Sequence, residues 1–247
     1  MKILGIDIGG SGIKGAIVDT ELGELLSERH RIPTPTPSTP HAVAEAIVKL
    51  TKQLEWNGPV GCGFPSPIHN GVAVMASNIS DKWIGVNVEM LFSQTLGMPV
   101  TVVNDADAAG LAEVKFGGGK GRKGLVMLLT IGTGIGSALI AEGKLVPNTE
   151  LGHLILKGDI AEKYCSDSAR KRDELSWKDW AKRFDRYLNH VNKLFYPDLF
   201  ILGGGASKKF DKFDDYLTVD APVVPAELLN LAGIIGAAIA AESRISG

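Results

Sequence analysis

The chain has 247 residues, 45% apolar content and a formal net charge of −2 at pH 7, which is typical of a globular protein with one large or two small domains. No apolar run approaches the roughly eighteen residues of a membrane span, and a strand is expected from the first residues, so we expect no membrane segment, no signal peptide and a cytoplasmic location. The two cysteines, Cys62 and Cys165, are too few for a disulfide framework or a thiolate metal site, and we interpret them as small buried apolar residues.

Strand-like and helix-like runs alternate along the chain. Thr39 and Pro40 are typical of a helix N-cap and a first helical residue. Strands are predicted over 2–7, 15–19, 24–31, 58–63, 99–104, 125–129, 137–141 and 199–202. Helices are predicted over 41–54, 88–96, 107–115 and 226–243, and along the segment from Trp177 to Leu194. The order strand, glycine turn, strand occurs twice, about 125 residues apart, which predicts two similar domains facing a cleft.

Two glycine-rich segments each directly follow an apolar strand-like run. They are residues 7–14, with the sequence DIGGSGIK, and residues 130–136, with the sequence TIGTGIG. Glycines let main-chain N–H groups approach an anion without interference from a Cβ, and hydroxyl groups and a lysine add donors. The isolated pair Asn104-Asp105 lies between the two segments, and a lone carboxylate can accept a substrate proton. Together these features indicate a phosphoryl-transfer cleft.

Residues 10–15 also satisfy the dinucleotide fingerprint G-x-G-x-x-G. A dinucleotide fold needs a helix directly after the glycines, whereas residues 16–19 continue as a β-branched strand, so the segment predicts a hairpin instead. A second match at residues 119–124 precedes its strand and is interpreted as a basic surface loop. The P-loop sequence G-x-x-x-x-G-K-[ST] does not occur in the chain.

Positive charge is concentrated in one part of the chain. Residues 157–212 hold thirteen Lys/Arg against nine Asp/Glu, a net charge of +4. Apolar residues recur at helical spacing from Trp177 to Leu194, and Lys178, Lys182 and Arg186 line a different face. This basic face is either an ordinary solvated helix face or a track for a polyanion.

Five motifs occur in the order found in ROK-family sugar kinases and resemble them: DIGGSGIK at 7–14, NDADA at 104–108, TIGTGIG at 130–136, ELGH at 150–153 and LGGG at 202–205. Three longer segments resemble polyphosphate glucokinases more narrowly: SNISDKW at 77–83, PNTELGH at 147–153 and PDLFILGGGASK at 197–208. The resemblance covers essentially the whole chain. It implies the α/β actin-like ATPase (ribonuclease H-like) fold, with a small N-terminal domain of residues 1–107 plus about 230–247, and a larger C-terminal domain of residues 108–229 across a central cleft.

The chain departs from the wider family in one place. Most ROK proteins carry a cysteine-rich zinc loop after the Gly-His pair, but no such cysteines follow Gly152-His153, and polyphosphate glucokinases look similar in this respect. We therefore predict no zinc, with His153 held by the fold alone. The missing loop also blurs the family's last sugar-binding glutamate, for which Glu162 is our candidate and Glu174 the substitute.

The resemblance implies a role for each motif residue. Asp105 is expected to be the catalytic base for a hexose 6-hydroxyl, with a helix N-cap as its structural alternative. Asp7 is expected to orient Mg²⁺ through water, with stabilisation of its turn as the alternative. The expected sugar-binding residues are Asn104, Asp105, Glu150, His153, Asn78 and Glu162. The expected phosphate-binding residues are Gly9, Gly10, Ser11, Lys14, Thr130, Gly132, Thr133, Gly134, Gly203, Gly204, Gly205 and Lys208.

The leading hypothesis is an enzyme of carbohydrate metabolism that phosphorylates glucose at the 6-hydroxyl, with inorganic polyphosphate as donor. The resemblance carries most of this expectation, and charge adds a physical reason. A nucleotide site needs apolar walls for its base, whereas lysines such as Lys208, Lys209 and Lys212 follow the LGGG motif here. The alternative is an ATP-dependent glucokinase or a related hexose kinase. We expect Mg²⁺ as cofactor, a homodimer, and no nucleic-acid or membrane partner.

Two other classes of protein are alternatives to a kinase. A ROK-type transcriptional repressor would need a DNA-binding helix-turn-helix before the first phosphate loop, and only about four residues precede Gly5. A regulatory sugar-binding or actin-like ATPase without kinase activity would not need Asp105. A coupled kinase assay discriminates between these classes.

Overall fold

The computed structural model describes residues 1–76 and 79–246, and the chain divides into two compact units. Unit 1 contains Met1–Ala112 and the C-terminal segment from Asn230, and unit 2 contains Glu113–Leu229. The chain passes from unit 1 to unit 2 within one helix and returns just before its last helix. The sequence places domain boundaries after residue 107 and near residue 230, a few residues from those of the compact units.

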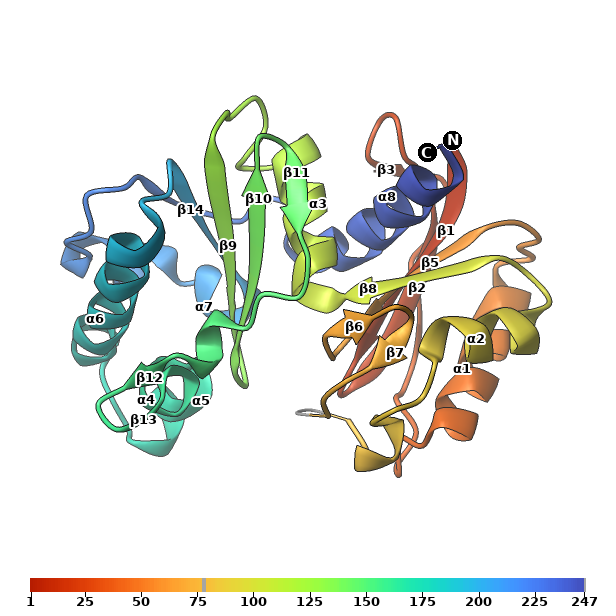
Figure 1. Ribbon diagram of the computed structural model, residues 1–247, viewed down its shortest axis with the longest axis horizontal. Helices are drawn as coiled ribbons and strands as arrows, with labels where there is room; N and C mark the ends of the chain where they lie inside the picture. The colour runs from red at the N-terminus through yellow and green to blue at the C-terminus, as the bar shows by residue number, and fades with distance from the viewer. Residues whose placement is uncertain (77–78, 247) are drawn as a thin grey trace. The chain divides into compact units, whose positions relative to one another are not determined.

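Unit 1 is built on a six-stranded sheet with the order β3-β2-β1-β5-β8, in which β4 also pairs with β2 (Figure 1). β1 pairs antiparallel with β2 and parallel with β5, which pairs parallel with β8. The strands are β1 Lys2–Gly9, β2 Gly12–Asp19, β3 Glu24–Leu25, β4 His30–Ile32, β5 Val60–Phe64 and β8 Val100–Asn104, with a separate hairpin of β6 Ile68–His69 and β7 Val72–Ala73.

Helices pack against both faces of the unit 1 sheet. They are α1 Pro40–Gln53, α2 Val88–Leu96, the first part of α3 Asp105–Phe116, and α8 Ala232–Ser246. Side chains alternate between the faces of a strand, and Leu4 and Ile6 of β1 share a buried core with α1 and α2. On the opposite face, a Cβ on Gly61 of β5 would collide with the main chain of Ala237 in α8. Glycine at this position therefore lets α8 lie directly on the sheet.

Unit 2 repeats the strand arrangement of unit 1. Its five-stranded sheet has the order β11-β10-β9-β14-β15, in which β9 pairs antiparallel with β10 and parallel with β14, which pairs parallel with β15. The strands are β9 Leu125–Ile131, β10 Ile135–Ala141, β11 Lys144–Val146, β14 Leu199–Gly203 and β15 Val223–Pro225, with a separate hairpin of β12 Ile155–Leu156 and β13 Asp159–Ile160. In each unit a glycine turn joins the antiparallel pair.

The helices of unit 2 are α4 Ala161–Cys165, α5 Asp167–Arg172, α6 Trp177–Phe195 and α7 Gly204–Ser207. The predicted apolar face of α6 is buried in the unit 2 core, through Trp180 and Phe184 among others. Leu194 is an exception, at 54% exposed, because the buried stripe ends one turn before the helix does. No helix in residues 1–76 or 79–246 combines the length and apolar character needed to cross a membrane.

Two predicted elements are wrong for identifiable reasons. The strand predicted over 24–31 is two short strands, because Ser27 Oγ accepts the Ile17 N–H at 3.0 Å and interrupts the main-chain ladder between β3 and β4. The helix predicted from residue 226 begins only at Ala232. Before it, the N–H groups of Glu227 and Leu228 donate to the buried carboxylate of Glu113, at 3.1 and 2.8 Å.

The contact between β5 and α8 makes a stability prediction. Gly61→Ala should lower the free energy of unfolding by about 1–3 kcal/mol, because the added methyl group overpacks a main-chain contact. Gly63→Ala, two residues along the same strand, is the matched control, because its Cβ would lie 3.6 Å from Ala108 Cβ in ordinary van der Waals contact. Urea unfolding of both variants checks this, and equal midpoints would contradict it.

Candidate active site

Two predicted carboxylates of unit 1 lie at one edge of its sheet. Asp7 is near the carboxyl end of β1, and Asp105 directly follows the carboxyl end of β8. β1, β5 and β8 run parallel, so these ends meet at the same edge, with only β5 between them. Two strand spacings amount to about 10 Å. The first glycine turn leaves β1 at this edge as well.

Asn104 provides the N-cap of α3. Sequence analysis gave this capping role to Asp105 as the alternative to catalysis. The Asn104 Oδ1 atom accepts the N–H groups of Ala106 at 2.8 Å and Asp107 at 3.1 Å, and its side chain is buried. The helix therefore begins at Asp105, two residues earlier than predicted. Asp105 is half-buried in the first turn, and its Oδ1 accepts the Ala106 N–H at 2.8 Å. Asn78, a predicted sugar ligand, lies outside the described residues.

Asp7 and Lys14 form an ion pair across β1 and β2. The two residues are register partners, and Lys14 Nζ lies 3.0 Å from Asp7 Oδ2. Within the described chain, no group of three or more His, Cys, Asp or Glu side chains is placed to hold a metal ion. A single carboxylate nevertheless fits a magnesium ion, because Mg²⁺ keeps several waters and takes one or two carboxylates together with substrate phosphates. Asp7 is compatible with the predicted water-mediated role.

The first glycine turn is a two-residue turn. The pairing of β1 with β2 ends at Gly9 opposite Gly12, so Gly10 and Ser11 lie beyond the ladder. Ser11 is exposed, and Thr34 Oγ1 donates to the Gly9 carbonyl at 2.5 Å. The turn is therefore braced from the segment that follows β4 and presents its tip to solvent.

Unit 2 brings its two predicted phosphate segments together. Thr130 of β9 is the register partner of Gly203 of β14, and the second glycine turn and α7 follow these two positions. Gly204 has a φ of 77°, a left-handed conformation that suits glycine. The Gly132 N–H donates to the Gly134 carbonyl at 3.0 Å, which closes the turn between β9 and β10.

Glu162 is the glutamate that the structure places beside His153. His153 Nε2 lies 3.8 Å from Glu162 Oε1, and Glu162 Oε2 accepts the Ile135 N–H at 3.1 Å. A Cβ on Gly134 would collide with this carboxylate, so one function of that glycine is to make room for Glu162. Glu174, the substitute candidate, is exposed in the loop between α5 and α6.

Glu150 precedes a short 3₁₀ helix over Leu151–His153, and His153 is its last residue. Its start is fixed by Ser137 of β10, whose Oγ accepts the Leu151 N–H at 3.0 Å and donates to the Thr149 carbonyl at 2.7 Å. Burial raises the pKa of Glu150 above its ordinary value, the His153 side chain acts to lower it, and Glu162 acts to raise it. Glu150, His153 and Glu162 therefore form one electrostatically coupled polar group.

The segment between His153 and Glu162 is the tight hairpin β12–β13, which sequence analysis did not predict. Lys157 and Gly158 form its turn with φ values of 58° and 87°, so both residues have the positive φ of a type I′ turn. The Ala161 N–H donates to the Leu154 carbonyl at 2.8 Å and closes the base of the hairpin. In the sequence, only the Lys157-Gly158 pair indicated a turn at this position. The hairpin reverses the chain and begins α4 beside His153.

The profile of the ROK family matches residues 3–171. The chain belongs to the ROK family. Its fold class is confirmed by solved ROK structures, including a ROK family glucokinase from Streptomyces griseus in complex with glucose and AMPPNP, with a TM-score of 0.84, 25% identity and coverage of 98% of this chain and 100% of that one.

Two relatives resemble this ROK chain over almost its full length. The polyphosphate glucokinase of Mycobacterium tuberculosis (strain ATCC 25618 / H37Rv) is 48% identical over 237 residues, which is 96% of this chain and 89% of the relative. The crystal structure of the inorganic polyphosphate/ATP-glucomannokinase from Arthrobacter sp. strain KM has 50% identity and a TM-score of 0.94, and the match covers 98% of this chain and 99% of that one. The predicted resemblance to polyphosphate glucokinases is therefore confirmed.

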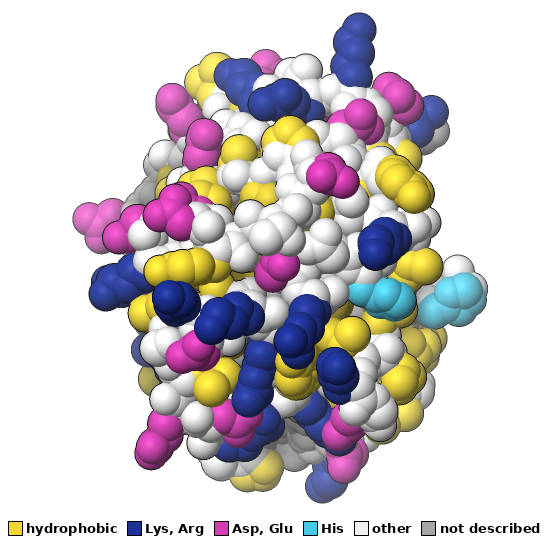
Figure 2. All heavy atoms as spheres, turned by 90° about the vertical axis from the view of Figure 1, so that its left-hand side faces the viewer, with side chains coloured by type: hydrophobic (Ala, Val, Ile, Leu, Met, Phe, Trp, Pro, Cys, Tyr) yellow, Lys and Arg dark blue, Asp and Glu magenta, His cyan; other side chains and the backbone are white. Residues whose placement is uncertain are grey.

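The basic side chains of the ROK chain's unit 2 differ in their partners. Lys182 Nζ lies 2.9 Å from Asp179 Oδ1, and Arg186 donates to the Tyr164 hydroxyl at 2.9 Å. In the part of the chain that the structure describes, no ion pair involves the three lysines that follow α7, which are Lys208, Lys209 and Lys212. Figure 2, which faces this end of unit 2, shows Lys and Arg side chains gathered on one region with acidic side chains among them. Asp179 thus offsets the charge of Lys182, whereas no carboxylate among the described residues pairs with the lysines after α7.

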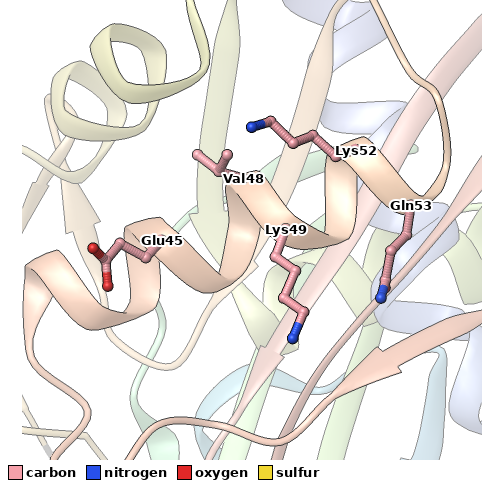
Figure 3. A pocket seen from close by; sticks show the side chains of 5 residues that line it. All are labelled: Glu45, Val48, Lys49, Lys52 and Gln53. Atoms are coloured by element: carbon pink, nitrogen blue, oxygen red, sulfur yellow. The ribbon is translucent and has the colours of Figure 1, made fainter.

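Two surface pockets of unit 1 contain no predicted site residue. One lies along α1 and is lined by Glu45, Val48, Lys49, Lys52 and Gln53 (Figure 3). The other is lined mainly by residues of the C-terminal ends of α1 and α2, together with Trp56 and Met98. In Figure 3 the long side chains project outward from one helix and do not converge on a common point. We assign no function to either pocket.

The raised pKa of Glu150 predicts the pH dependence of sugar binding. Protonation would remove the charge with which Glu150 is predicted to accept a sugar hydroxyl, so the KM for glucose should rise as pH falls, with a midpoint above the ordinary glutamate value of about 4.3. Glu150→Gln should raise the KM for glucose and remove this pH dependence, and Glu174→Gln is the exposed control. The pH profile of kcat/KM for glucose measures both effects, and a wild-type profile in Glu150→Gln would contradict the assignment.

Proposed function

We propose that this protein transfers a phosphoryl group from inorganic polyphosphate to the 6-hydroxyl of glucose and releases glucose 6-phosphate. The observation that carries the proposal is its 48% identity, over 96% of the chain, with a polyphosphate glucokinase. The structure supplies groups suited to such a reaction. Unit 1 carries a half-buried carboxylate at a sheet edge, and unit 2 carries a cluster of two glutamates and a histidine.

Asp105 acts as the general base in this proposal. A hexose hydroxyl is a weak nucleophile, and a carboxylate within hydrogen-bond reach accepts its proton as the oxygen attacks the terminal phosphoryl group. The position of Asp105 supports the role, because Asn104 Oδ1 accepts both capping N–H groups and Asp105 shares only the one from Ala106. The main chain in the first turn of α3 therefore positions Asp105.

Glu150, His153 and Glu162 bind the sugar hydroxyls, together with Asn104 and Asn78. Sugar recognition needs several fixed polar groups, because each unpaired buried partner costs about 1–3 kcal/mol. The two glutamates accept hydroxyl protons, and His153 can accept or donate according to its tautomer. The imidazole ring of His153 lies beside the Glu162 carboxylate, and that carboxylate accepts the Ile135 N–H.

The glycine segments bind the phosphates of the donor: Gly9, Gly10, Ser11 and Lys14 in unit 1, and Thr130, Gly132, Thr133, Gly134, Gly203, Gly204, Gly205 and Lys208 in unit 2.

A divalent cation completes the proposal, and we assign it as Mg²⁺ held through water by Asp7. Such an ion neutralises the phosphate charge that develops during transfer. The ion pair holds Lys14 close to the same carboxylate.

ATP is the second candidate donor, because the Arthrobacter structure with 50% identity is that of a polyphosphate/ATP-glucomannokinase. The cytoplasmic location, the homodimer, and the lack of nucleic-acid and membrane partners stay predictions.

The base assignment predicts a selective loss of turnover. Asp105→Asn should lower kcat by about 10²-fold or more while glucose binding and thermal unfolding stay close to wild type, because the general base is lost and the cap is kept. Steady-state kinetics and glucose titration measure the two effects separately. Near-normal turnover in the folded variant would refute the role of Asp105.

The donor assignment is tested by measuring glucose 6-phosphate with polyphosphate, with ATP and with neither, at two salt concentrations. Polyphosphate should support turnover, and its KM should rise with added salt, because exposed cations that bind a polyanion are screened. Lys208→Glu should raise the KM for long polyphosphate more than Lys182→Glu does, because Lys182 is already paired with Asp179. Turnover with ATP but not with polyphosphate would refute the donor assignment and identify an ATP-dependent glucokinase.

A further inference from the structure

Arg31 is a cation beside the first glycine turn to which the proposed mechanism gives no task. It lies on β4, directly opposite Lys14 of β2, and Lys14 is in turn opposite Asp7 of β1. Residues directly opposite each other on paired strands project from the same face of a sheet. Asp7, Lys14 and Arg31 therefore form a row of charged side chains across three neighbouring strands, next to the turn.

The two cations of this row differ in their partners. Lys14 is paired with Asp7 at 3.0 Å. Arg31 forms no ion pair with any residue that the structure describes, and its Nη2 donates to the main-chain oxygen of Ser11 at 2.7 Å. Like charges on opposite residues of paired strands repel each other, and Asp7 compensates the positive charge of Lys14 only. An anion that binds from solution would compensate the positive charge of Arg31.

The guanidinium group of Arg31 lies against the turn itself. A Cβ on Gly12 would be 2.8 Å from Arg31 Cζ, so the guanidinium occupies the space that a side chain at position 12 would fill. The hydrogen bond to Ser11 fixes the group at the tip of the turn, and Arg31 is otherwise exposed. A cation that is held in place before binding loses little conformational freedom when a ligand arrives.

We propose that Arg31 binds a phosphate group of the phosphoanhydride donor at the first glycine turn. The planar guanidinium matches two phosphate oxygens, and its N–H groups other than the one bonded to Ser11 have no partner among the described residues and can donate to the ligand. Gly12 leaves room for this group beside the turn. The inference rests on the proposed function, in which the donor is a chain of phosphates. Polyphosphate and ATP share that chemistry.

The experiment compares Arg31→Gln with Arg29→Gln. Arg29 is an exposed arginine two residues away in the same segment, outside β4 and outside the proposed site, so the two variants lose the same charge. Arg31→Lys keeps the charge and loses the planar fork. Each protein is assayed for the KM of polyphosphate, of ATP and of glucose, and for the binding of tripolyphosphate by calorimetry without glucose. Thermal unfolding confirms that each variant is folded.

We expect Arg31→Gln to raise the KM for the donor by about 10- to 100-fold at an unchanged KM for glucose, the effect of losing a charge-assisted hydrogen bond. Arg31→Lys should lie between wild type and Arg31→Gln, and Arg29→Gln should differ from wild type by less than about twofold. Equal effects of Arg31→Gln and Arg29→Gln, or equal changes in the KM for donor and glucose, would overturn the inference.

Calorimetry separates this inference from the proposed function. If wild type makes no glucose 6-phosphate but binds tripolyphosphate, and Arg31→Gln weakens that binding at least tenfold, the Arg31 site stands and the proposed function fails. If wild type is active and Arg31→Gln binds tripolyphosphate as wild type does, the function stands and the Arg31 site fails. A weaker effect on polyphosphate than on ATP would assign the site to the nucleotide's phosphates.

Discussion

The parallel pairing of β1, β5 and β8 is the constraint on which the unit 1 site depends. Because the three strands run in one direction, Asp7, the first glycine turn and Asp105 emerge at one edge although they are about a hundred residues apart in sequence. The antiparallel return of β2 then brings Lys14 back beside Asp7. The pairing of β9 with β14 does the same in unit 2, where it sets Thr130 beside Gly203.

The glycines of the two turns serve packing as well as phosphate access. Gly134 leaves the space in which the Glu162 carboxylate reaches the Ile135 N–H, and Gly12 leaves the space in which Arg31 lies. A charged side chain thus approaches the main chain at each turn: an acidic one in unit 2 and a basic one in unit 1. In unit 2 the carboxylate is held beside His153, and in unit 1 the guanidinium is held beside the turn tip. Each turn therefore combines main-chain groups with one fixed charge.

A buried carboxylate also organises the segment that precedes the return to unit 1. Glu113 in α3 accepts main-chain N–H groups from Gly118 at 3.0 Å, Glu227 at 3.1 Å and Leu228 at 2.8 Å. Its side chain is buried with these donors as partners, so its polar atoms are not left unsatisfied. Gly117 has no room for a Cβ beside this carboxylate. The glycine directly after α3 is therefore explained by an acid that lies several residues earlier.

The sequence by itself determined the family, the two strand–turn–strand repeats, most helices and the motif residues, because these depend on local periodicity and on spacings that recur in related chains. Thr39 caps α1 and Val88–Leu96 is helical, as expected from short-range signals. The sequence named Glu162 ahead of Glu174, but only the tertiary structure shows that Glu162 lies beside His153, because this contact depends on how the β12–β13 hairpin turns the chain. The tertiary structure also decided that Asn104 caps α3 and that Arg31 lies on Gly12, since both contacts depend on where strands place side chains in space. Sequence spacing records which groups are present, but the pairing of strands determines which of them meet.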